Sequence, residues 1–161
     1  MNVPQRFAAV VFFLTLITTT GAWSAPSSTS VGTLTAPFGS SSVLAWSWGA
    51  SNSGTLGGGG GGGAGKANIQ DLSLTRFADG QSPLFFNAVV KGQHLASVVL
   101  VDGSTTITLN GVLITSISTG NGSPDGKPTP RTENITFTFG TVTYAVGGAS
   151  ICFNPSTQTS C

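Results

Sequence analysis

Charged side chains are scarce in this 161-residue chain, at 7% of its residues, where a soluble protein usually has about a quarter. Six Lys and Arg nearly balance five Asp and Glu, which gives a formal net charge of +1. This balance provides no basic surface for nucleic acid and no polybasic patch for anionic lipid. Hydrophobic residues make up 39% of the chain, which argues against a disordered, charged tail.

The residues that usually carry chemistry are also scarce. His94 is the single histidine, Cys152 and Cys161 are the two cysteines, and the carboxylates follow no recognisable spacing. His94 comes just after Gly92, at a predicted helix end where the helix dipole favours a histidine. Residues 60–66 fit the first seven positions of a phosphate-binding loop, but Ala67 replaces the hydroxyl that would bind magnesium. We therefore expect no catalysis, no cofactor and no metal.

The N-terminal segment has the plan of a secretory signal peptide. Arg6 precedes an apolar run over residues 7–17, and the small residues Ala22, Ser24 and Ala25 follow. The run is too short to span a bilayer, so we predict a cleaved signal peptide over 1–24 and no stable membrane anchor after processing. The mature chain is then periplasmic or extracellular. It keeps five basic and five acidic residues, and a surface with zero net charge has little to resist self-association.

Export places the two cysteines in an oxidising compartment. Cys152 and Cys161 are either two free thiols or a disulfide that closes a small loop. We favour the disulfide because no other cysteine competes for either partner. Such a disulfide constrains only a short C-terminal tail, so we expect it to add little to the stability of the domain.

Alternating apolar residues predict a mainly β domain. The predicted strands cover residues 43–48, 67–77, 96–101, 105–109, 112–117 and 132–146. Asp102-Gly103 predicts a hairpin turn, and the parity of the apolar residues in the last strand switches at Gly140. A bulge near residues 70–71 would bring Ile69 onto the face of the residues that follow. These elements indicate a compact antiparallel barrel or sandwich.

A short helix interrupts the strands. We expect Ser82 to cap it, Pro83 to occupy its first position, residues 84–91 to form its body and Gly92 to end it. The domain boundaries predicted with it are 1–24 for the signal peptide, 25–42 for a Ser/Thr/Gly/Pro-rich arm or weak edge strand, 43–148 for the barrel and 149–161 for a tail with the cysteine pair.

The first strand carries two tryptophans on one face. Leu44, Trp46 and Trp48 share that parity. A sugar-stacking platform is one interpretation, but core or interface residues are the more usual one. A glycine-dominated loop over residues 52–65 follows, which no regular element can use.

An ordered set of motifs resembles one known family. The motifs are VLAWSWG over 43–49, Ser53-Gly54, GAGKANIQDLSLTRF over 63–77, Ser82-Pro83, SISTG over 116–120 and TENITFTF over 132–139. Together they resemble the haemolysin-coregulated protein (Hcp) family, the tube protein of the type VI secretion system. The resemblance covers residues 43–146, most of the mature chain.

The resemblance implies a two-sheet β-barrel with one helix on its side. It also implies non-catalytic hexameric rings that stack into a tube, effectors carried in the pore, and secretion spike proteins as partners. We expect the oligomer contacts at Trp46, Trp48, Gly57, Gly65 and Lys66, because a glycine-rich loop that cannot pack a core is free to reach a neighbour.

The resemblance is incomplete at the N-terminus. The family usually starts with an apolar strand and has no cleavable signal, whereas this chain has the predicted signal peptide and arm there. An alternative function follows from this departure: an exported domain of the same fold that acts as a free binding module, unrelated to tube assembly.

Overall fold

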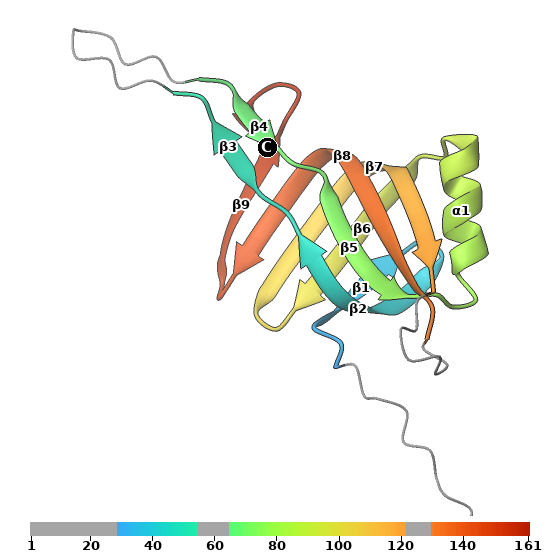
Figure 1. The fold of residues 1–161 in the computed structure, drawn as a ribbon. Coiled ribbons are helices and arrows are strands. Elements are labelled where there is room, and N and C mark those ends of the chain that lie inside the picture. The colour runs from blue at the N-terminus through green and yellow to red at the C-terminus, as the bar shows by residue number, and fades with distance from the viewer. Residues whose placement is uncertain (1–28, 55–64, 122–129) are drawn as a thin grey trace, which may run out of the picture.

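The computed structural model describes residues 29–54, 65–121 and 130–161 (Figure 1). Glycine 57 and the predicted signal peptide lie outside these residues. The strands are β1 (Gly32–Ala36), β2 (Gly39–Ser47), β3 (Ala50–Asn52), β4 (Ala67–Ile69), β5 (Leu72–Phe77), β6 (Leu95–Asp102), β7 (Thr105–Gly120), β8 (Thr132–Val146), β9 (Ala149–Asn154) and β10 (Thr159–Ser160), with the helix α1 (Ser82–Lys91) between β5 and β6.

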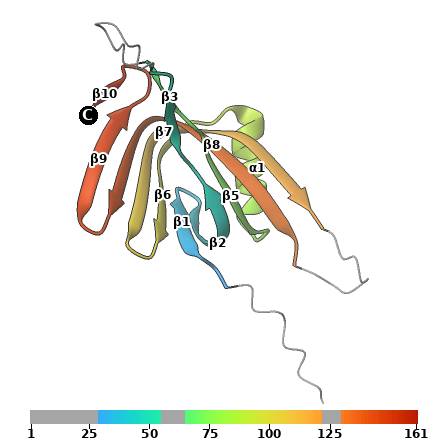
Figure 2. The same cartoon turned by 60° about the vertical axis from the view of Figure 1, so that its left-hand side comes forward.

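The main sheet closes into an antiparallel barrel. Its strands follow the order β8-β5-β2-β1-β6-β7, and β7 pairs back onto β8. The first half of β8 pairs with β5, whereas its second half pairs with β9. Strands β3 and β4 form a separate two-stranded ribbon that continues outward from β2 and β5 (Figures 1 and 2). The predicted mainly β barrel with one short helix is thus confirmed.

Apolar side chains from all six strands of the barrel fill its interior, because alternate residues of each strand point inward. The fully buried members of this core include Leu34, Val43, Leu72, Val98, Ile107, Leu109, Ile135 and Phe137. The helix α1 adds Phe85 and Ala88 to the core from the side. The glycine-rich, low-charge sequence therefore still buries one contiguous core.

The N-terminal segment differs from the expected arm. Residues 32–36 form β1, which pairs with both β2 and β6 and so lies inside the barrel wall. In β1 the Leu34 side chain is fully buried, and Ala36 is nearly buried. The short alternation in a Ser/Thr-rich stretch gave too weak a signal, and the two neighbouring strands supply the pairing that fixes it. The barrel wall is therefore continuous between β2 and β6 at the N-terminal segment, where the sequence predicted an arm or a weak edge strand.

The structure differs from the predicted strand faces at two places, one in β2 and one between β4 and β5. A register shift between Val43 and Ala45 sends Val43 inward and leaves Leu44 half-buried, so Leu44 does not share the inward face with Trp46. At residues 70–71 the chain does not bulge. It leaves the ribbon and enters the barrel, because β4 pairs with β3 while β5 pairs with β2 and β8.

The helix forms where the sequence predicted it. Pro83 lies in its first turn, and Gly92 ends it in a left-handed conformation with φ of 60°. The N-cap is Gln81 and not Ser82, because the Ser82 hydroxyl accepts the Asp79 N–H at 3.0 Å in the preceding turn. Phe85 and Ala88 face the barrel, whereas Leu84 is exposed.

The C-terminal segment is a hairpin and not a tail. Residues 149–154 form β9 on the second half of β8, and the two-residue β10 folds back onto β9. The predicted disulfide joins Cys152 to Cys161.

The predicted parity switch in β8 is also present, since Ile135 and Phe137 are buried before Gly140 and Val142 is buried after it. None of the helices in the described residues is long and apolar enough to cross a membrane.

Candidate assembly surfaces

An apolar groove runs between the ribbon and the strands β8 and β9. It has a volume of about 240 Å³ and is lined by Trp48, Ala50, Ala67, Ile69, Val142, Tyr144, Ile151 and Phe153. The ribbon side supplies the first four of these residues and the sheet supplies the others. The groove exists because β5 leaves β8 halfway along its length and the ribbon continues above the sheet.

Trp48 lies at the centre of this groove. Its ring centroid is 5.4 Å from that of Tyr144, with the two planes tilted by 47°. Its indole Nε1 is buried and has no hydrogen-bond partner among the described residues. Buried indole N–H groups usually find an acceptor. Trp48 therefore presents an unused donor beside a wholly apolar and aromatic lining.

Trp46 has a different environment although it is two residues away. Its side chain is half-buried against the core, and Nε1 donates to Asp102 Oδ2 at 2.8 Å. Asp102 ends β6, so this bond ties β2 to the β6–β7 hairpin. Of the two tryptophans predicted as oligomer contacts, Trp48 is the one whose polar atom is left without a partner.

The base of the glycine-rich loop is held by Asn52. Its side-chain amide donates to the Gly65 carbonyl at 2.9 Å and its Oδ1 accepts the Gly54 N–H at 2.8 Å. A Cβ on Gly65 would lie 2.7 Å from the Ser53 carbonyl carbon, so only glycine fits there. Lys66 is exposed beside it. The two predicted contacts Gly65 and Lys66 thus lie at the outer end of the ribbon, just before Ala67, which lines the groove.

A second apolar surface lies on α1, on the other side of the barrel (Figures 1 and 2). Leu84, Phe86 and Val90 are 46%, 59% and 68% exposed. The sheet surface near the groove also exposes Tyr144, Val146 and Ile151. Phe86 and Val90 lie four positions apart and share one face of α1, whereas Leu84 lies on another face, so Phe86 and Val90 and the exposed sheet residues are the two candidate contact surfaces.

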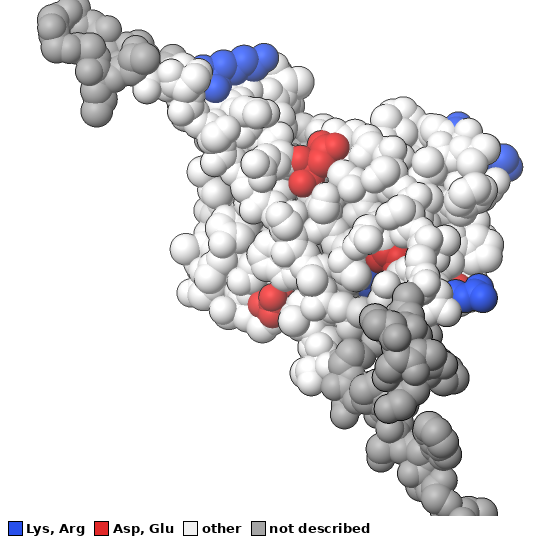
Figure 3. All heavy atoms as spheres, in the orientation of Figure 1, with Lys and Arg blue, Asp and Glu red and all other residues white. Residues whose placement is uncertain are grey.

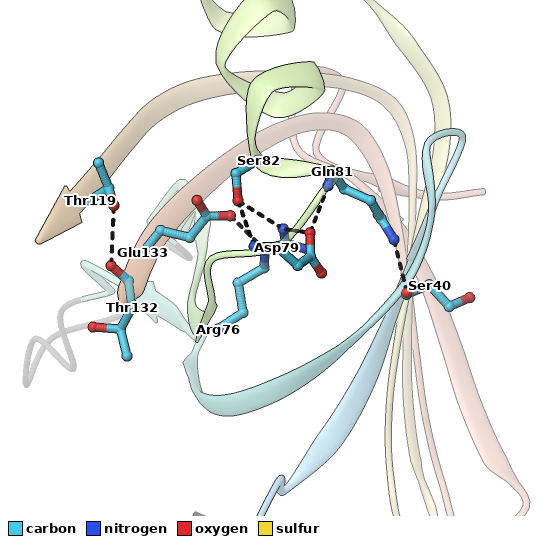
Figure 4. A network of polar contacts seen from close by, with 8 residues as sticks. All are labelled: Ser40, Arg76, Asp79, Gln81, Ser82, Thr119, Thr132 and Glu133. Atoms are coloured by element: carbon cyan, nitrogen blue, oxygen red, sulfur yellow. Dashed lines mark hydrogen bonds and ion pairs between the residues drawn. The ribbon is translucent and has the colours of Figure 1, made fainter. Parts of the chain in front are cut away.

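A buried charge network lies under the N-terminus of α1 (Figure 4). Arg76 Nε donates to Glu133 Oε1 at 2.6 Å, and Nη2 donates to Asp79 Oδ1 at 2.6 Å and to Ser82 Oγ at 3.3 Å. The guanidinium also lies 4.8 Å from the centroid of the Phe85 ring. Arg76 is fully buried and Glu133 is 1% exposed.

The spacing of the carboxylates in the sequence did not predict this network. A signal was present, because Arg76 continues the inward parity of Leu72 and Leu74, and Glu133 has the inward parity of Ile135. The two residues are also direct partners in the β5–β8 register. Arg76 bonds to Glu133, Asp79 and Ser82, whereas its buried Nη1 has no hydrogen-bond partner among the described residues. The network joins β5, β8 and the start of α1, which makes it a structural feature of the barrel.

The remaining polar residues form no reactive constellation in the part of the chain that the structure describes. His94 is exposed after the end of α1. No three His, Cys, Asp or Glu residues gather as metal ligands in the described ranges. Part of the phosphate-loop-like stretch, residues 60–64, lies outside those ranges, and Ala67 begins a strand where the nucleotide motif needs a helix.

The barrel with its flanking helix is the fold of solved type VI secretion proteins. One solved type six secretion system protein superimposes with a TM-score of 0.67 at 23% identity, over 74% of this chain and 85% of that one. Hcp1 from Salmonella typhimurium gives a TM-score of 0.65 at 19% identity, over 81% of this chain and 97% of that one. These two structures show that the chain has the barrel fold of type VI secretion proteins.

The family follows from sequence. A family model described as "Type VI secretion system effector, Hcp" matches residues 37–146. Protein hcp1 of Pseudomonas aeruginosa is 41% identical over 109 residues, which are 62% of this chain and 65% of that protein. The chain thus spans slightly less than two thirds of the length of this relative. It belongs to the Hcp family, a family of secreted, structural and non-catalytic proteins of type VI secretion.

Proposed function

We propose that the mature chain assembles head to tail into a closed six-membered ring, and that stacked rings form a secretion tube. The observation that carries this proposal is the presence of two different apolar surfaces on opposite sides of one barrel. The α1 surface exposes Phe86 and Val90, and the groove surface exposes Tyr144 and Ile151. Effectors in the pore and secretion spike proteins are the partners that such a tube would have.

Two unlike surfaces favour a ring over a two-fold dimer. A two-fold interface uses the same patch on both subunits, whereas a head-to-tail interface pairs one patch with another and closes when the rotation allows it. The few charges offer little electrostatic repulsion between copies, and Figure 3 shows a face on which Lys, Arg, Asp and Glu are sparse.

Light scattering and negative-stain imaging of the mature protein test this proposal. We expect six-membered rings for the natural sequence and loss of rings for Phe86→Ser, because a polar group would replace the most protruding aromatic of α1. Asn87→Ser is the matched control, since Asn87 is exposed on the same helix and is already polar. A strict monomer across the micromolar range would contradict the ring.

That monomeric outcome would favour the second candidate function, an exported domain that acts as a free periplasmic or extracellular binding module. The sequence pattern of residues 1–24 supports export by a signal peptide. Intact mass of protein from a native-like host should lack about the first 22–25 residues. Full-length protein retained in the cytoplasm would remove the basis for export and for this candidate.

A further inference from the structure

The turn between β9 and β10 is fixed by its own hydrogen bonds. Asn154 Oδ1 accepts the N–H groups of Ser156 at 2.9 Å and Thr157 at 3.3 Å. The Gln158 N–H then donates to the Asn154 carbonyl at 2.9 Å. Among the described residues, Gln158 is the one non-glycine residue with a positive φ, which is 60°. A positive φ is uncommon for glutamine, so the surrounding turn must hold the residue in this conformation.

The Gln158 side chain reaches the ribbon. Its Nε2 donates to the Pro155 carbonyl at 2.6 Å, which orients the amide. Its Oε1 accepts the backbone N–H of Ala67 at 2.9 Å, across 91 positions of sequence. Ala67 is the first residue of β4 and one of the residues that line the groove. The C-terminal turn is therefore bonded to the element that forms one wall of the groove.

The disulfide lies directly beside this turn and closes the hairpin that carries it. Strand β10 has only two residues and pairs with β9 at Thr159 and Ser160. Just beyond it, Cys161 is bonded to Cys152 and donates its N–H to the Cys152 carbonyl at 3.3 Å. A two-residue exposed strand has little stability of its own. The covalent bond holds both ends of the turn that presents Gln158.

We propose that this hairpin is a redox-sensitive latch: the Cys152–Cys161 disulfide fixes the turn, and Gln158, a positioning residue, holds the ribbon over the groove. A dithiol reductant would open it, because two electrons and two protons from the dithiol convert the disulfide into two thiols while the dithiol becomes a disulfide. Strand β10 then frays, the bond to Ala67 is lost and the groove wall is released. All of these contacts lie within one protomer, so the latch does not rest on the proposed ring.

Amide hydrogen exchange on the full mature chain tests the latch. Reduction with dithiothreitol and the variant Gln158→Asn should each accelerate exchange at Ala67 by about fivefold, which corresponds to the loss of one hydrogen bond. Asparagine tolerates positive φ but is too short by one methylene to reach β4. Ser160→Ala is the matched control, because this exposed side chain lies in the same hairpin and its loss should leave Ala67 unchanged.

Two results would overturn the latch. If the Ala67 rate is the same in oxidised and reduced protein, the disulfide does not act on the ribbon. If Gln158→Asn leaves that rate unchanged, the side-chain contact does not hold β4. Both readouts lie within one protomer, so a monomer in light scattering would contradict the ring and leave this test intact.

Discussion

The two ends of the barrel are stabilised by different means. At the α1 end, the strands β5 and β8 lie in a filled core, and a charged pair is buried between them. At the ribbon end, β3 and β10 are exposed along their whole length, and β9 is exposed over its first half. That end is held by the Gln158 contact, the Asn52 contacts and the disulfide.

This contrast follows from how much apolar surface each end buries. The α1 end excludes water, so its interactions depend on one another, and removal of one charge leaves the other without a partner in a dry environment. The strands at the ribbon end are largely exposed to water, so each hydrogen bond there contributes only about 1 kcal/mol and acts locally. We therefore expect changes at the first end to affect global unfolding and changes at the second to affect local opening.

Arg76→Met should produce the largest effect. It leaves Glu133 buried without its partner, and breaking a buried pair in this way costs roughly 3–5 kcal/mol of unfolding free energy. Urea unfolding followed by circular dichroism measures this change. The double variant Arg76→Met with Glu133→Leu should recover much of the loss, because no charge then remains in the core. If Arg76→Met alone were as stable as the natural protein, the α1 end would depend on its buried charges no more than the ribbon end depends on its hydrogen bonds.

Leu34→Ala should produce the next largest effect. Leu34 is fully buried in β1, and truncation of a buried leucine costs about 2–5 kcal/mol. The neighbouring exposed residue gives the control Thr33→Ala, for which we expect a change within about 0.5 kcal/mol. Equal and small effects for the two variants in the same urea experiment would mean that residues 32–36 behave as an arm.

The double variant Cys152→Ser with Cys161→Ser should have the smallest effect on global unfolding. The bridge spans nine positions at the C-terminus, and we expect a loss of about 1–2 kcal/mol, at the low end of the range for disulfides. Thermal unfolding with and without a reductant provides the comparison. A loss as large as that of Arg76→Met would show that the hairpin belongs to the cooperative core.

Much of the barrel was predictable from apolar periodicity. The long strands, the hairpin turn at Gly103, the helix ended by Gly92 and the parity switch at Gly140 were all foreseen. The strand β1 was predicted only as an arm or a weak edge strand, and not as part of the barrel wall. Five residues with one leucine give little periodic signal, and their position depends on pairing with β2 and β6. The Arg76–Glu133 pair was missed although its parity was visible, because charged residues were read only as possible surface or catalytic groups.

The sequence by itself determined the period of the strands, the turn and helix ends set by glycine and proline, the disulfide partners and the family, since each depends on local residue types or on a motif order. The tertiary structure alone decided which residues come together. It placed β1 in the barrel wall, separated the partners of β4 from those of β5, brought Gln158 to Ala67 and left the Trp48 indole without a hydrogen-bond partner among the described residues. The physical reason is that barrel closure and long-range pairing depend on the summed burial of distant strands, which no short stretch of sequence contains.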